Sequence, residues 1–421
     1  MQVSKHPASF RIWGLAAVLT VMAPACVSKG ATGPPPTTIA HMPTSVHKSS
    51  AAPKPTTVSP TPIALPSPPL SCAHKVLHHL TLPQRVGQLF ALGLASDRLG
   101  PAELDVIRTH HVGSVWFTET TTSGVASVRA VATAVQAQAT RVATGGVRFY
   151  VAANQEGGVI QALQGVGFSP IPSAVTQGMS PPSTLRRDAL VWGRQLSEAG
   201  VNLDFSPVMD VVPPGTDALN QPIGALQREF GHDPATVAKH GRSFIHGMSD
   251  AGVATTAKHF PGLGRVRGNT DNVAGVTDTS TTGTSASLRS FRAAVTAGVP
   301  FVMVALATYT QIDAAHLAVF SPAVMRLLRA GMGFKGVITS DDLGAAKAVA
   351  GLAPASRAID FLTAGGDLIV SKTVAPTVAM TDAVVARAST DPSFAARVND
   401  AVRHVLAAKD ASGLLPCSSN Q

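Results

Sequence analysis

The sequence predicts a (β/α)8 barrel, a single closed ring of parallel strands surrounded by helices, over residues 72–417. Short apolar runs, each bounded by Gly, Pro or polar residues, alternate there with helical patterns. No Gly-x-Gly-x-x-Gly follows the first run, which gives a dinucleotide-binding sheet little support. Polar residues follow several of the runs, as at the C-terminal rim of a barrel, where active sites lie. A doubly wound open sheet is the structural alternative.

The predicted elements follow the chain in a regular order. Each strand is a short apolar run with a break at both ends. The predicted strands cover residues 86–93, 111–117, 148–153, 201–209, 253–259, 300–307, 336–340 and 367–371. Of the helices between them, one covers 182–200, with Ser183 as a possible N-cap and Gly200 at its end. A second helix of the same form covers 233–252.

Composition is consistent with one large folded domain. The 421 residues are 45% hydrophobic, which excludes a wholly disordered chain and is enough to bury a sizeable core. The formal net charge is +9, and five of these positive charges lie in residues 1–71, which contain no acidic residue. The remaining 350 residues carry +4. This is too little to indicate nucleic-acid binding, and no nucleic-acid partner is expected.

Residues 1–25 are typical of an export signal. Lys5 and Arg11 form a basic region, and the apolar stretch 12–23 is shorter than the roughly 20 residues that span a bilayer. Small residues before Cys26 resemble a bacterial lipobox, although Ala23 stands where Leu is usual. We therefore expect lipidation at Cys26, with plain signal cleavage near residue 25 as the alternative.

Residues 26–71 are predicted to hold the folded domain away from a membrane. They are rich in Pro, Thr, Ser and Ala and contain no acid, so they cannot bury enough surface to fold. The predicted location is the outer face of the cell membrane, as a lipoprotein; secretion is the alternative. Residues 418–421 are expected to form a short tail.

Two cysteines flank the predicted barrel, Cys72 at its start and Cys417 at its end. Exported proteins meet oxidising conditions, and the termini of a domain are often close together. The sequence therefore predicts a Cys72–Cys417 disulfide, with two free thiols as the alternative.

Polar groups follow four of the predicted strands. They are Asn154–Gly158 after the third strand, Asp210 after the fourth, Lys258–Gly262 after the fifth and Ser340–Asp342 after the seventh. Each is weak alone, because Lys-His pairs are often structural and Asp-Asp often begins a helix. Four strands that end in such groups at one rim predict a functional site.

These residues closely resemble glycoside hydrolase family 3. The resemblance is carried by five motifs in the family's order: Gln155–Gly158 (QEGG), Phe205–Asp210 (FSPVMD), Arg228–Pro234 (REFGHDP), Lys258–Gly264 (KHFPGLG) and Gly336–Leu343 (GVITSDDL). Because no second α/β domain follows the barrel, the chain is similar to the N-acetyl-β-glucosaminidase branch, whose members include bacterial lipoproteins. The resemblance implies removal of terminal non-reducing β-linked N-acetylglucosamine from peptidoglycan-derived sugars, through a covalent glycosyl-enzyme and without a cofactor.

The resemblance also implies roles for individual residues. A retaining glycosidase needs a carboxylate that attacks the anomeric carbon and a group that protonates the leaving oxygen. The nucleophile would be Asp341, and Arg228, Lys258 and His259 would hydrogen-bond sugar hydroxyls. Asp342, on the opposite face of its strand, is expected to cap a helix that begins at Leu343.

The chain departs from the branch at three positions. The branch carries an Asp-Ser-His run whose His is the acid/base, and the same spacing here gives Asn269-Thr270-Asp271. Asp271 is therefore the candidate acid/base, since carboxylic acids commonly fill this role; loss of hydrolysis is the alternative. Asn154 replaces a sugar-binding Asp, and Ala162 replaces an Arg that holds the sugar.

Two other functions remain open. One is a catalytically impaired, glycan-binding relative on the same barrel, and the other is a β-glucosidase of the same family. No metal site is expected, because His110 and His111 are adjacent and lack the i, i+4 spacing of a helical zinc pair.

Overall fold

The computed structural model describes residue 33 and residues 71–417. The predicted export signal, the lipidation site at Cys26, the linker apart from residues 33 and 71, and the tail 418–421 lie outside the described residues.

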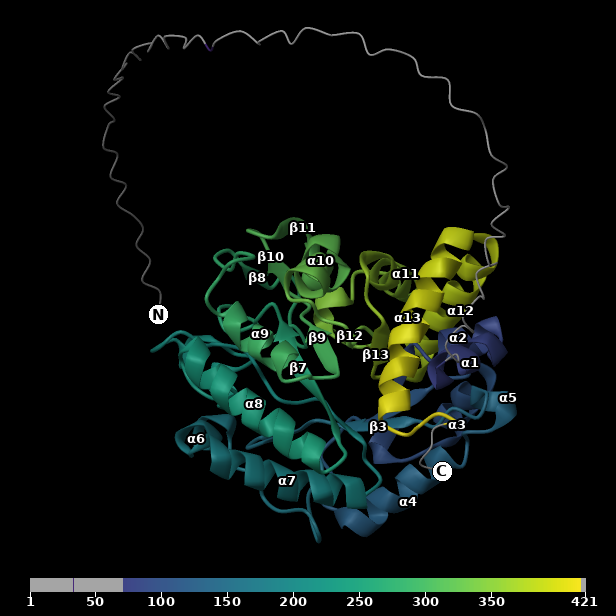
Figure 1. Cartoon of the computed structure of the whole chain (residues 1–421), viewed down its shortest axis with the longest axis horizontal. Helices are drawn as coiled ribbons and strands as arrows, with labels where there is room; N and C mark the ends of the chain where they lie inside the picture. The colour runs from purple at the N-terminus through teal and green to yellow at the C-terminus, as the bar shows by residue number, and fades with distance from the viewer. Residues whose placement is uncertain (1–32, 34–70, 418–421) are drawn as a thin grey trace, which may run out of the picture. The chain divides into compact units, whose positions relative to one another are not determined.

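Eight parallel strands form a closed barrel with helices outside it (Figure 1), which confirms the predicted fold class. Around the ring they run β1, β2, β3, β6, β7, β9, β12, β13 and back to β1. Their bounds are β1 Phe90–Leu94, β2 Ser114–Phe117, β3 Tyr150–Ala153, β6 Leu203–Asp204, β7 Ala254–Phe260, β9 Phe301–Val304, β12 Val337–Asp342 and β13 Leu368–Ser371.

Closure of the ring is visible in the register of β1. Leu92 pairs with Val115 of β2 on one side and with Ser371 of β13 on the other. The inside of the ring is filled by side chains, as in other small barrels. Tyr150 of β3 and Phe301 of β9 meet edge-to-face with ring centroids 5.2 Å apart.

The helices connect successive strands and cover the outside of the ring (Figure 1). They are α1 Cys72–His79, α2 Leu82–Gly87, α3 Pro101–Thr109, α4 Gly124–Gln136, α5 Arg141–Thr144, α6 Ala174–Met179, α7 Pro182–Glu198, α8 Pro234–Asp250, α9 Leu288–Thr296, α10 Pro322–Arg326, α11 Pro354–Ala364, α12 Val374–Thr390 and α13 Pro392–Ala411. The two predicted helices are α7 and α8. Asp233 caps α8 by accepting hydrogen bonds from two backbone amides, whereas Ser183 lies inside the first turn of α7 and is not its N-cap.

Several predicted strands are longer than the observed ones; those predicted at 111–117 and 300–307 cover only Ser114–Phe117 and Phe301–Val304. The strand predicted at 86–93 begins at Phe90, because a capping box between Thr81 and Gln84 starts helix α2 and makes residues 86 and 87 helical. The strand predicted at 201–209 pairs only over Leu203–Asp204. Beyond it the chain turns into the loop that carries Asp210.

Short strands outside the ring lie in three of the C-terminal loops, those after β3, β7 and β9. β4 Gln155–Gly157 and β5 Ile160–Gln161 form a hairpin directly after β3. β8 Thr277–Asp278, β10 Thr308–Tyr309 and β11 Asp313–Leu317 form a separate small sheet.

The structure contains the predicted disulfide between Cys72 and Cys417. The two Cα atoms are 5.8 Å apart and the bond spans 345 residues. Cys72 begins α1, which packs on α13, so the bond joins the two ends of the barrel domain.

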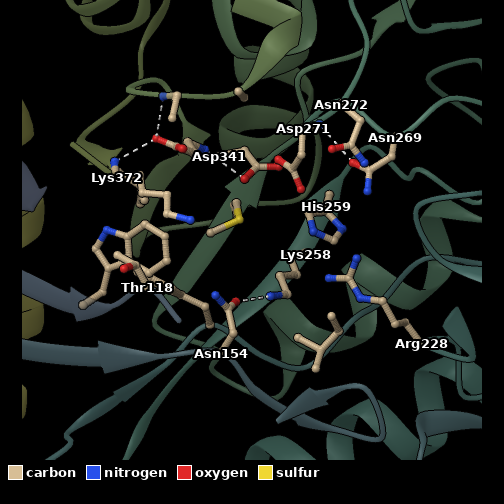
Figure 2. A pocket seen from close by; sticks show the side chains of 18 of the residues that line it. Thr118, Asn154, Arg228, Lys258, His259, Asn269, Asp271, Asn272, Asp341 and Lys372 are labelled. Atoms are coloured by element: carbon tan, nitrogen blue, oxygen red, sulfur yellow. Dashed lines mark hydrogen bonds between the residues drawn. The ribbon is translucent and has the colours of Figure 1, made fainter. Parts of the chain in front are cut away.

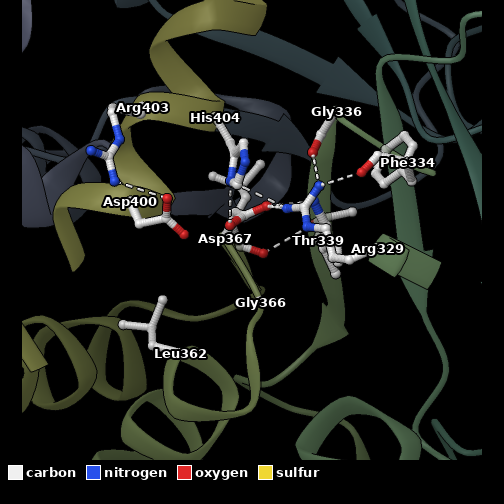
Figure 3. Close-up of polar contacts among 12 residues, drawn as sticks. Arg329, Phe334, Gly336, Thr339, Leu362, Gly366, Asp367, Asp400, Arg403 and His404 are labelled. Atoms are coloured by element: carbon white, nitrogen blue, oxygen red, sulfur yellow. Dashed lines mark hydrogen bonds and ion pairs between the residues drawn. The ribbon is translucent and has the colours of Figure 1, made fainter. Parts of the chain in front are cut away.

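Buried polar networks support the end of the barrel opposite the site. Asp367, fully buried before β13, accepts hydrogen bonds from Arg329, Arg397 and His404, and its Oδ2 atom accepts from the backbone amide of Ile338 at 2.9 Å (Figure 3). These contacts join α13, β12 and the start of β13 to the segment that precedes β12.

No helix of residues 71–417 combines the length and the apolar character that crossing a membrane requires.

A second network centres on Lys409 of α13. This buried side chain donates to Gln88 Oε1 at 2.7 Å, Gly113 O at 2.7 Å and Arg148 O at 2.9 Å. The three acceptors precede β1, β2 and β3, so one ammonium group ties the starts of three strands. Burial lowers the pKa of Lys409 to about 7, whereas the three acceptors favour the protonated form.

Candidate active site

The C-terminal ends of the strands surround a cavity of about 440 Å³, a volume within the usual range of small-ligand sites (Figure 2). It is lined by Trp116, Thr118, Asn154, Ile160, Phe205, Leu226, Arg228, Lys258, His259, Asn269, Asp271, Asn272, Met303, Asp341, Asp342, Ala345, Ala346, Val370 and Lys372. Every predicted catalytic or substrate-binding residue is among them. The polar residues predicted to converge at one rim after the strands therefore lie around the cavity.

One wall of the cavity is organised by Glu156, a residue to which the sequence analysis assigned no role. Arg228 donates to both of its carboxylate oxygens, from Nε at 2.8 Å and from Nη2 at 2.7 Å. The Nζ atom of Lys258 lies 2.6 Å from Glu156 Oε1 and donates to Asn154 Oδ1 at 2.7 Å. The two cations are thus held in fixed positions on a common anion.

The charge state of Glu156 follows from these partners. Burial alone would raise its pKa, but the charges of Arg228 and Lys258 and their hydrogen bonds hold the pKa of Glu156 at about 2. Glu156 is therefore ionised at every physiological pH and orients two donors toward the cavity. Glu156 belongs to the Gln155–Gly158 motif. Its role as an acceptor depends on segments that meet only in the folded protein.

His259 is oriented by a buried carboxylate. Its Nδ1 atom lies 2.8 Å from Asp210 Oδ2, and Asp210 Oδ1 accepts from the backbone amides of His259 and Leu263. The fully buried Asp210 carboxylate can only accept this hydrogen bond. Nδ1 therefore carries the proton, and Nε2 is left for the cavity. Asp210 is thus a positioning residue beneath the site.

Asp341 is the second-last residue of strand β12 and presents its carboxylate to the cavity (Figure 2). Its Oδ1 atom accepts the backbone amide of Asp342 at 2.9 Å. The prediction that Asp342 caps a helix starting at Leu343 is wrong. No α-helix begins there, and Asp342 Oδ1 instead accepts from the amides of Gly344, Ala345 and Lys372, which fixes the turn after β12 against the end of β13.

Asp271 reaches the same cavity from the loop after β7. Asn269 Oδ1 accepts the backbone amide of Asp271 at 2.9 Å, and the carbonyls of Thr270 and Asp271 accept the amides of Ala348 and Lys347 at 3.0 and 3.2 Å. These bonds dock the loop on the segment after β12. Figure 2 shows the carboxyl groups of Asp271 and Asp341 turned toward each other, with the His259 ring beside them.

The pKa of Asp271 is raised to about 6. The first cause is desolvation, because the carboxyl group points into the cavity among protein atoms, although the residue as a whole is exposed on the loop. The second cause is the negative charge of Asp341, while His259 and Arg228 act in the opposite direction. A carboxyl group with a raised pKa that faces a second carboxyl group suits the role of an acid beside a nucleophile.

The two remaining departures from the family pattern have different structural outcomes. Asn154 lines the cavity and accepts from Lys258, so it keeps a polar contact at that position. Ala162 is buried in the hairpin beside the site, and it does not line the cavity.

The sequence analysis also missed Trp116, Thr118 and Lys372. Thr118 and Lys372 come directly after predicted strands, so the rule used for the other rim residues could have found them. The Lys372 side chain points into the cavity (Figure 2). Trp116 also lines the cavity, and its buried Nε1 atom has no hydrogen-bond partner within residues 71–417.

Two facing carboxyl groups above a floor of fixed hydrogen-bond donors, at the C-terminal rim of a (β/α)8 barrel, define a glycosidase type of site. Residues 81–408 match the glycosyl hydrolase family 3 N terminal domain. The chain belongs to this family and is a glycoside hydrolase.

Similar proteins agree with this assignment. A crystal structure described as beta-N-acetylhexosaminidase from Beutenbergia cavernae is 48% identical, with a TM-score of 0.77, over 78% of this chain and 98% of that one. A family 3 beta-N-acetylglucosaminidase from Paenibacillus is 26% identical, with a TM-score of 0.72, over 80% of this chain and 63% of that one. Beta-hexosaminidase LpqI from Mycobacterium tuberculosis is 32% identical over 73% of this chain and 78% of its own length.

Proposed function

We propose that this protein hydrolyses terminal, non-reducing β-linked N-acetylglucosamine from cell-wall sugars by a retaining mechanism. The observation that carries the proposal is the pair of facing carboxyl groups, Asp341 at the end of β12 and Asp271 on the docked loop. The names of the similar hexosaminidases support N-acetylglucosamine as the sugar.

In the first step Asp341 attacks the anomeric carbon of the terminal sugar. The bond from that carbon to the leaving oxygen breaks, and Asp271 gives its proton to that oxygen, so the aglycone leaves as a neutral alcohol. A carboxyl group with a pKa of about 6 is partly protonated near neutral pH, which suits this role.

In the second step water releases the sugar. Asp271, now ionised, takes a proton from the water while the water oxygen attacks the anomeric carbon. The bond between that carbon and Asp341 then breaks. The configuration of the sugar is retained because the anomeric carbon is inverted twice. Asp271 returns to its protonated state and Asp341 to its ionised state.

The wall of the cavity that Glu156 organises holds the sugar. Arg228 and Lys258 keep their charges through Glu156 and can donate further hydrogen bonds to hydroxyls, and His259 offers Nε2. Asn154 adds an amide with both donor and acceptor atoms. Because these groups are already fixed, the sugar binds without reorganising them.

Export and anchoring belong to the same proposal. A lipid at Cys26 would place the barrel at the outer face of the cell membrane, within reach of cell-wall glycan. The predicted export signal supports this location, and the Cys72–Cys417 disulfide is in keeping with an oxidising compartment.

The decisive experiment compares chromogenic N-acetylglucosaminide and glucoside turnover by the wild type and by Asp341→Asn. This variant keeps the shape of the side chain and removes its charge, and turnover should fall by several orders of magnitude. A mechanism-based fluorosugar should label a peptide that contains Asp341. Labelling at Asp342 or Asp271 would overturn the assignment. Preferred glucoside turnover would identify a β-glucosidase, and tight binding without turnover would identify a glycan-binding relative.

A further inference from the structure

A second group of charged side chains lies outside the cavity, on the same side of the barrel. Asp217 begins the short 3-10 helix η2 (Asp217–Leu219) in the loop after β6, and Glu229 and His232 lie between that loop and α8. One potential ligand atom from each residue falls within 4.8 Å of those of the other two. None of the three lines the active-site cavity.

The central residue of this group is a buried carboxyl group with an unpartnered oxygen. Glu229 is 1% exposed, and its Oε2 atom has no hydrogen-bond partner in the described part of the chain. Glu156, by contrast, is buried against two cations. Because a buried polar atom without a partner is unfavourable, Glu229 Oε2 is available as a metal ligand.

The histidine completes a set of metal-binding atoms. His232 Nδ1 lies 3.6 Å from Asp217 Oδ1 and 3.2 Å from the carbonyl oxygen of Val212. Zinc ligands at about 2.1 Å in a tetrahedral site are about 3.4 Å from one another. The Asp217–His232 separation is already close to that value, and the Glu229 ligand atom lies within 4.8 Å of both.

We propose that Asp217, Glu229 and His232 bind a divalent metal ion of the zinc type. The imidazole favours zinc over calcium or magnesium, which prefer oxygen ligands alone. Because Asp217 and His232 are partly open to solvent, an ion can enter, and water can fill the remaining coordination position.

The bound ion would fasten the loop after β6 to the start of α8. Glu229 directly follows Arg228, whose guanidinium is held by Glu156 in the active site. The metal would therefore stabilise the backbone beside a sugar-binding residue without contacting the sugar. This is a structural site, and it does not depend on the proposed glycosidase mechanism.

A competing zinc position must be controlled in the test. His74 and His78 of α1 are four residues apart, and their Nε2 atoms are 3.3 Å apart. This pair offers only two ligands, so it should bind zinc less tightly than the group of three. His78→Ala removes the pair and leaves the proposed site intact.

The experiment measures zinc binding by equilibrium dialysis with elemental analysis, together with Tm, on the chelator-treated protein. We expect about one zinc per chain in the wild type and in His78→Ala, with a rise in Tm of about 4 °C when zinc is a hundredfold above its Kd. His232→Asn and Glu229→Gln should each weaken zinc binding at least tenfold and reduce the rise in Tm to about half or less.

Glu229→Gln also distinguishes a lost ligand from a damaged fold. Gln keeps the size of the side chain and removes only the carboxylate ligand, so the Tm of Glu229→Gln without metal should stay close to that of the wild type. The proposal is overturned if the wild type binds no zinc at micromolar concentration, if both site variants bind it as the wild type does, or if only His78→Ala loses it.

Discussion

The pH dependence of Asp271 gives a quantitative test of its role. With a pKa of about 6, Asp271 is half protonated at pH 6 and about 1% protonated at pH 8. For a substrate whose leaving group needs a proton, kcat/KM should therefore fall by about 50-fold between these pH values. An aryl glycoside with an activated leaving group departs without the proton and should show a much smaller decline.

Asp271→Ala should remove this difference between the substrates. Hydrolysis of disaccharides should fall far more than that of activated aryl glycosides, the decline above pH 6 should disappear, and azide should restore turnover by attacking the glycosyl-enzyme. The assay is initial-rate kinetics from pH 5 to pH 9 on both substrate classes. If Asp271→Ala matches the wild type on both, Asp271 is only a loop residue and the reasoning is refuted.

The raised pKa of Asp271 also predicts a change in stability. The folded-state pKa lies above the ordinary value of Asp, so the folded state binds more protons between about pH 4 and pH 6. The stability contributed by this group is therefore greatest below pH 4 and declines as the pH rises through 6. Asp271→Asn should melt at a higher temperature than the wild type at pH 7, and this difference should vanish near pH 4.

Three further predictions concern buried charges and the disulfide. Glu156→Gln should lower kcat/KM and destabilise the fold by about 3–5 kcal/mol in urea titration, because it leaves Arg228 and Lys258 without their anion; an unchanged midpoint would contradict this. Lys409→Met should cost about 3 kcal/mol by the same measurement, since three buried acceptors lose their donor, and a loss below 1 kcal/mol would count against the network. Non-reducing peptide mapping should recover Cys72 linked to Cys417, and Cys72→Ser should cost about 4 kcal/mol; alkylation of both cysteines without reduction would exclude the bond.

The sequence alone determined the fold class and several of the polar residues that line the cavity. Short buried strands and their breaks are local signals, and in a parallel barrel the residue after each strand necessarily lies at one rim. That rule places Asn154, Lys258, His259 and Asp341 at the same rim from the sequence alone. The cap at Asp233 was also local, because its partners are two and three residues away.

Only the tertiary structure decided which charges meet. Glu156 follows β3, Arg228 lies in the loop after β6 and Lys258 is in β7, and nothing in the spacing of these residues states their distance. The same holds for Asp217, Glu229 and His232, and for Lys409, which reaches three strand starts from the last helix. Periodicity reports whether a residue is buried, whereas the partner of a buried charge depends on the paths of loops that share no repeat.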